Sequence, residues 1–115
     1  MRSTKNTPSG DEIWQRVKEF AENCRTHKTP VFTLHRRVRN FITEVTDTRI
    51  GRNSDEGHSK DAQSAVSRGA VLALWDYFTG RGERPKVLYF TLALMAEALP
   101  DVPEVQDGVA ELRRD

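Results

Sequence analysis

The stretch SRGAVLALWDYFTG, from Ser67 to Gly80, predicts the helix around which the rest of the chain is arranged. Apolar residues recur in it at i, i+3, i+4 and i+7, which places them on one face of a helix. These residues are Val71, Leu74, Trp75 and Phe78. Ser67 carries a hydroxyl that can cap the N-terminus, and Gly80 can adopt the left-handed conformation that ends the last turn. The broad apolar face of this helix must be covered by other segments.

An N-terminal helix is the first of these segments. Ser9 and Glu12 form an S-x-x-E capping box, in which each side chain accepts a hydrogen bond from the other residue's backbone N–H. The apolar residues that follow at helical spacing are Ile13, Trp14, Val17, Phe20, Ala21 and Cys24. The pattern predicts an amphipathic helix that ends near Arg25. Residues 1–8 are polar and aperiodic, and we expect them to form a disordered tail before a single domain over residues 9–115.

The hydrophobic period then changes from 3.6 to 2. The runs 31–34, 38–45 and 49–54 are rich in β-branched residues and are separated by short turns, which predicts an antiparallel three-stranded meander. Strict alternation puts Phe41, Thr43 and Val45 on one face of the second strand and Asn40, Ile42 and Glu44 on the other. In the third strand Ile50 is the clearest inward position.

The C-terminal half predicts a loop and further helices. Residues 55–63 are polar and indicate a surface loop, and residues 64–66 are either a short strand or the approach to the cap at Ser67. Residues 87–99 are apolar almost all round, which is typical of a buried helix, and a last short helix has Val105, Val109 and Leu112 on one face. The fold class is therefore α+β, with two to three helices packed on one face of the sheet and the other face open to solvent.

Composition restricts the class of protein. The chain has 115 residues, of which 37% are hydrophobic and 30% charged, and this suits one small domain with a charged surface. Its single cysteine cannot form an internal disulfide. No apolar N-terminal signal follows Met1. The longest apolar run, 87–99, is shorter than the roughly 20 residues that are needed to span a bilayer. We expect a cytoplasmic protein that is not embedded in a membrane.

Charge is unevenly distributed along the chain. Residues 1–54 contain 11 Lys and Arg against 6 Asp and Glu, whereas residues 55–115 contain 7 against 11. Three interpretations fit: a face that attracts polyanions, two faces that attract each other between copies, or ordinary surface charge.

Residue patterns that indicate catalysis or metal binding are missing from the sequence. Cys24 and the histidines at 27, 35 and 58 do not provide the paired ligands, two to four residues apart, that structural zinc needs. The sequence contains no G-x-S-x-G, no G-x-x-x-x-G-K and no G-x-G-x-x-G. We therefore predict no catalytic residue, no metal, no cofactor and no enzymatic activity, and we rank a hydrolase or nuclease last.

Basic and polar side chains instead indicate a surface for nucleic acid. Arginines cluster at the first turn, and Arg49 and Arg52 are three apart on the third strand, so that one of them should lie on the open face. Ser67 and Arg68 begin the central helix, where backbone N–H groups favour an anion. The predicted phosphate- and base-contacting residues are Arg36, Arg37, Arg39, Arg49, Arg52, Asn53, Ser54, Lys60, Ser67 and Arg68.

The order of these segments resembles small α+β DNA-associated accessory domains found beside bacterial restriction endonucleases. The likeness rests on EIWQRVKEFA, VFTL, RNFITEVTDTRIGRNS, AVSRGAVLALWDYF and YFTLALMAEALP, and covers about residues 12–100. It implies a DNA-associated accessory domain, with the V-S-R helix start at Val66, Ser67 and Arg68 and the third-strand positions at Arg49, Arg52 and Ser54. Together with the missing catalytic patterns, this predicts a non-enzymatic DNA-binding or DNA-processing accessory domain with duplex DNA as the expected partner. The alternative is a protein-interaction or homodimerisation domain that uses the apolar helix 87–99.

Overall fold

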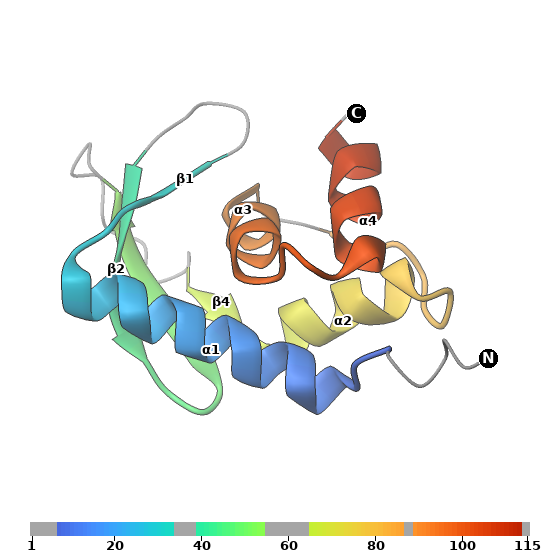
Figure 1. Cartoon of the computed structure of the whole chain (residues 1–115), viewed down its shortest axis with the longest axis horizontal. Helices are drawn as coiled ribbons and strands as arrows, with labels where there is room; N and C mark the ends of the chain where they lie inside the picture. Colours follow the sequence, from blue (N-terminus) through green and yellow to red (C-terminus); the bar gives the residue numbers. More distant parts are fainter. Residues whose placement is uncertain (1–6, 34–38, 55–64, 87–88, 114–115) are drawn as a thin grey trace.

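The computed structural model describes residues 7–33, 39–54, 65–86 and 89–113. In chain order, the elements are α1 (Gly10–His27), β1 (Val31–Phe32), β2 (Arg39–Val45), β3 (Arg49–Ser54), β4 (Val66–Ser67), α2 (Arg68–Phe78), α3 (Tyr89–Ala98) and α4 (Pro103–Arg113). Figure 1 shows the sheet at one side of the molecule and α2, α3 and α4 at the other, with α1 running from the sheet toward α2. The α+β class predicted from the sequence is confirmed.

The predicted helix boundaries are correct to within about two residues. The capping box of α1 is complete, because Glu12 N–H donates to Ser9 Oγ and Ser9 N–H donates to Glu12 Oε1. Helix α1 continues two residues beyond Arg25 and ends with Lys28 in the left-handed conformation, at φ 54°. Ser67 caps α2, and Gly80 follows its end with φ 79°. In the expected helix 87–99, residues 87 and 88 lie outside the described part of the chain.

The sheet has four antiparallel strands in the order β1-β2-β3-β4, one more than the sequence predicted. The additional strand is β4, in which Val66 pairs with Ile50 and Ser67 pairs with Arg49. Two residues are too few to show a hydrophobic period, so the sequence did not decide whether this segment is a strand or the approach to the helix cap.

A β-bulge in β2 corrects the predicted faces of this strand. The register shifts between Ile42 and Glu44, so that Glu44 pairs with Gly51 and Val45 with Ile50. Asn40, Ile42 and Val45 therefore face the helices, while Thr43 and Glu44 both lie on the open face. The extra residue of a bulge breaks the alternation on which the prediction depended.

One hydrophobic core lies between the sheet and the helices. Ile42 and Ile50 from the sheet, Trp75 from α2 and almost all of α3 are buried in it. The predicted apolar face of α4 is confirmed, because Val105, Val109 and Leu112 are all buried. Helices α1 and α3 contact β2 and β1 respectively, and so cover the inner face of the sheet.

Candidate nucleic-acid interface

The open side of the sheet is the surface on which several of the predicted contact residues meet. The alternation of the strands and the bulge place side chains from all four strands there, and we call this surface the outer face. It consists of Phe32, Arg39, Phe41, Thr43, Glu44, Arg49, Asn53 and Ser67, and the buried Gly51 pairs with Glu44 beneath it. The helices α1 and α3 lie on the opposite, inner face.

Two arginines and one carboxylate set the charge of the outer face. Arg39 is exposed, and Arg49 lies 3.4 Å from Glu44, Nε to Oε2, with side chains that are 47% and 48% exposed. An ion pair this exposed contributes between about 0 and 1 kcal/mol, so Arg49 can exchange Glu44 for another anion at little cost. Counted over the described residues of this face alone, two arginines stand against one carboxylate.

Two phenylalanines interrupt this polar surface. Phe32 is 43% exposed, one of only two large hydrophobic side chains that are exposed among the described residues, and Phe41 is half-buried. In the strand register Phe32 lies directly opposite Arg39, and Phe41 lies directly opposite Asn53. Each aromatic ring is therefore flanked by a side chain that can donate hydrogen bonds. Neither phenylalanine is among the contact residues predicted from the sequence, although strand alternation already puts Phe41 on the face of β2 opposite to Asn40.

Arg52 lies on the inner face, opposite to Arg49, as strand alternation predicts for residues three apart. Its Nη1 donates to Oδ1 of the buried Asn40 at 2.5 Å, and its guanidinium lies 4.6 Å from the ring centre of Phe90 on α3. The structure therefore separates Arg52 from Arg39 and Arg49, with which the sequence analysis had grouped it.

The start of α2 is engaged in contacts within the chain. Ser67 Oγ accepts the backbone N–H of Ala70 at 3.0 Å. Arg68 Nη2 bonds to Asp11 Oδ1 at 2.8 Å and so links α2 to the first turn of α1. Arg68 is therefore directed toward the helices and does not extend the outer face.

The remaining predicted contacts are only partly placed. Asn53 is exposed on the outer face. Ser54 ends β3, where it pairs with Asn40 in the register. Arg36, Arg37 and Lys60 lie outside the described residues.

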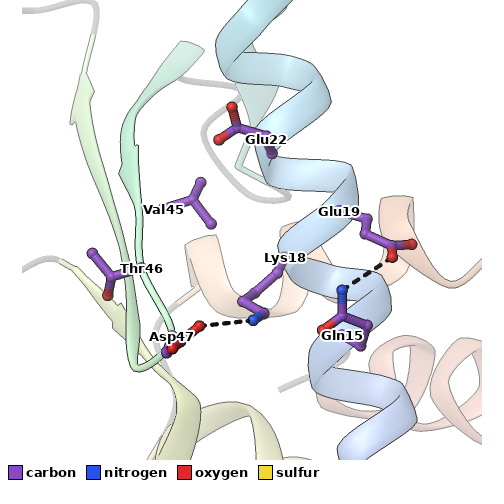
Figure 2. A pocket seen from close by; sticks show the side chains of 7 residues that line it. All are labelled: Gln15, Lys18, Glu19, Glu22, Val45, Thr46 and Asp47. Carbon is purple, nitrogen blue, oxygen red and sulfur yellow. Dashed lines mark hydrogen bonds and ion pairs between the residues drawn. The ribbon is translucent and has the colours of Figure 1, made fainter.

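Figure 2 shows a groove between α1 and the turn that joins β2 to β3, with a volume of about 260 Å³. Lys18 Nζ reaches Asp47 Oδ1 across it at 3.2 Å, and Gln15 Nε2 donates to Glu19 Oε2 at 3.0 Å. Glu22, also in its lining, is hydrogen-bonded by Arg25, which holds the pKa of this carboxyl below its usual value. The groove thus contains three carboxylates and one ammonium group, a balance that disfavours a polyanion.

A smaller cavity of about 70 Å³ lies between β4, the start of α2 and Thr91 of α3. Its polar lining includes Ser67, whose hydroxyl already caps α2, and the buried Thr91. This volume holds only a few water molecules and is far below that of a drug-sized ligand site.

Groups with metal-binding or nucleophilic chemistry are sparse in the described ranges. No set of three or more His, Cys, Asp or Glu side chains is arranged to hold a metal ion there. Cys24 is buried, and burial, followed by the charge of Glu97, raises the pKa of its thiol. Nδ1 of His27 lies 3.0 Å from the carbonyl oxygen of Asn23 on the same helix. Over the same ranges, no helix has the length and apolarity needed to cross a membrane.

Comparison of the chain with protein-family models, with curated proteins and with solved structures finds no match. The geometry of the outer face is therefore the basis for assigning a function.

Proposed function

We propose that this chain is a non-enzymatic DNA-binding domain and that DNA lies against the outer face of its sheet. One observation carries the proposal: Arg39, Arg49 and Asn53 share a sheet face that α1 and α3 leave open. Arginine side chains bind phosphate oxygens, and the asparagine amide can bond phosphates or base edges. The resemblance to DNA-associated accessory domains leads to the same expectation.

The distribution of charge supports this placement of DNA. The groove of Figure 2 is lined by Glu19, Glu22 and Asp47 and would repel a phosphate backbone. Three carboxylates and the single ammonium group of Lys18 line the groove, whereas the described residues of the outer face include two arginines, Arg39 and Arg49, against the one carboxylate of Glu44. A polyanion is therefore attracted to the outer face in preference to the groove.

The experiment that tests the proposal is a titration of fluorescently labelled DNA, single-stranded and duplex, followed by anisotropy at several salt concentrations. We expect binding to weaken as salt rises, because phosphate contacts release counterions. Arg49→Ala should weaken binding to every sequence and reduce the slope of log K against log salt by about 0.7 to 0.9, the value for one phosphate contact.

Arg81→Ala is the matched control. Arg81 also bonds one carboxylate, Asp76, at 3.4 Å and is 58% exposed, but it lies just beyond α2, away from the outer face. We expect its loss to leave binding unchanged. Equal effects of the two substitutions, or no binding of either DNA at low salt, would refute the proposal.

The alternative function, self-association through the apolar helix 87–99, gains no specific support. The described residues of α3 are largely buried by the chain itself: Phe90 to Met95 and Ala98 are buried, as is Leu99 just beyond the helix, and Tyr89 and Glu97 are exposed. The apolarity of the helix is thus accounted for within one molecule. Sedimentation analysis at high protein concentration would reveal a dimer if one forms through another surface.

A further inference from the structure

Building on the proposed function, we infer that the outer face takes single-stranded DNA and that Phe32 and Phe41 stack on its bases. The inference starts from an exposure that the core does not explain. Phe32 is 43% exposed on a two-residue edge strand, where a polar side chain would cost less. Aromatic side chains on an open, weakly basic surface are the usual platform for unpaired bases.

The register sets the backbone spacing of the two phenylalanines. Phe32 lies opposite Arg39, and Phe41 is two residues farther along β2 on the same face, so the two phenylalanines are diagonal neighbours. Diagonal pairs across antiparallel strands are about 7–8 Å apart at Cα. This is roughly twice the 3.4 Å spacing of nucleotides along one strand of a duplex. Bases stacked on both rings must therefore be separated from each other, which a single strand permits and a base-paired duplex resists.

The neighbours of the rings supply the polar contacts. Asn53 is directly opposite Phe41, so its amide lies beside any base stacked on that ring and can bond the base edge. Arg39 is directly opposite Phe32, and Arg49 is exposed on β3 on the same face. The arginines would contact the phosphates on either side of the stacked bases, so one short surface provides stacking, edge bonding and charge.

We expect duplex DNA to make fewer contacts with the outer face than single-stranded DNA does. Reading a duplex requires an element that enters the major groove, typically a helix or a two-stranded ribbon. The helices α1 and α3 lie on the inner side of the sheet, and among the described residues those of the outer face all belong to strands. The two arginines and one glutamate among the described residues of this face make only a weak electrostatic contribution to duplex binding.

The test is anisotropy with a labelled single strand of oligothymidine, about 12 nucleotides long to cover one site, and a mixed-sequence duplex of the same length. We expect the single strand to bind at least tenfold more tightly than the duplex. Phe32→Ala should weaken single-strand binding by roughly fivefold to a hundredfold, the range for one stacked base, and should leave the salt slope unchanged. Phe32→Trp should retain binding, because the indole also stacks.

Tyr89→Ala is the control for a general effect of removing an exposed ring. Tyr89 is 45% exposed but begins α3, on the covered side of the sheet. We expect the Tyr89→Ala variant to bind the single strand as tightly as the unmodified chain does. Melting temperatures check that each variant is folded. Tighter binding of the duplex, or unchanged single-strand binding in Phe32→Ala, would overturn the inference. The proposed function would still stand in that case if Arg49→Ala weakens DNA binding. Absence of binding to both DNAs would overturn the two together.

Discussion

Arg52 on β3 donates a hydrogen bond from Nη1 to the side-chain oxygen of Asn40 on β2, at 2.5 Å. Asn40 is completely buried, and its Nδ2 donates to the carbonyl oxygen of Val31 on β1 at 3.3 Å. The guanidinium also lies over the ring of Phe90 on α3. One arginine thus joins the edge of the sheet to the most buried helix, and we expect it to stabilise the fold.

We predict that Arg52→Ala lowers the free energy of unfolding by about 1–3 kcal/mol, because it removes a charged donor from a buried amide and a cation–π contact. Urea denaturation measures the change. Asn53→Ala, at the next position but exposed on the outer face, should change stability by less than about 0.5 kcal/mol. A destabilisation of equal size in both variants would contradict the structural role of Arg52.

Gly108 on α4 allows α4 to approach α2 closely. A Cβ atom built at this position would lie 2.2 Å from Cδ1 and 2.7 Å from Cγ of Phe78, so the whole ring would have to move. We predict that Gly108→Ala destabilises the fold by about 1–3 kcal/mol, although alanine favours a helix by about 1 kcal/mol over glycine. Thermal or urea unfolding checks this value.

Gly69, in the first turn of α2, is the matched control. A Cβ atom there meets nothing nearer than Ser67 Oγ at 3.9 Å, so Gly69→Ala should be neutral or stabilising. The double variant Gly108→Ala/Phe78→Ala should show that the two changes are not additive, because without the ring there is nothing for the new methyl group to displace.

Glu44 is the carboxylate that opposes DNA on the outer face. We predict that Glu44→Gln tightens DNA binding roughly two- to fivefold at low salt, because it removes a repulsive charge and releases Arg49 to phosphates. Anisotropy titrations at low and high salt measure the gain, which should shrink as salt screens the charge. Asp76→Asn, which frees Arg81 in the same way beside α2, should not tighten binding.

The ion pair between Arg16 on α1 and Asp101, in the turn before α4, makes the stability of the fold depend on pH. Arg16 bonds both carboxylate oxygens, at 2.5 and 3.3 Å, and its hydrogen bonds are the main cause that lowers the pKa of Asp101 below its ordinary value. A lowered pKa in the folded state contributes stability that is present above the ordinary pKa and is lost as pH falls through the folded-state pKa.

We therefore predict that Asp101→Asn is less stable than the unmodified chain near neutral pH. The difference should begin to shrink as pH falls below about 4, the ordinary pKa of an aspartate, and should disappear only once pH has fallen through the lowered folded-state pKa. Urea denaturation at a series of pH values provides the measurement. A difference that persisted unchanged into strong acid would mean that Asp101 acts through something other than its charge.

Much of the fold could be predicted because its signals are local. The capping hydroxyls of Ser9 and Ser67, the glycine at 80 and the apolar faces of α1 and α2 all depend on residues within a few turns of one another. Two features could not be predicted in this way. Strand β4 exists only through its pairing with β3, and the bulge in β2 is a property of two strands together.

The candidate site was predictable in part. The sequence placed Arg49 and Arg52 on opposite faces of one strand, and it identified Asn53 beside them. It also grouped Arg68 with the site, whereas Asp11, 57 residues earlier in the chain, holds this side chain beside α1. Phe32 and Phe41 were overlooked because an aromatic residue in a strand predicts burial unless the covered face is known.

By itself, the sequence determined the class of every element except β4 and the existence of an apolar core, since propensity, capping and periodicity act over short distances along the chain. Only the tertiary structure decided which face of the sheet stays open and which arginines reach it. The reason is that a side chain's surroundings depend on strand register and on the helices that cover the sheet, and both bring together residues far apart in the sequence. Arg49 and Arg52 show this most clearly, because two like residues of one strand lie on opposite faces, one exposed beside Glu44 and the other packed over Phe90.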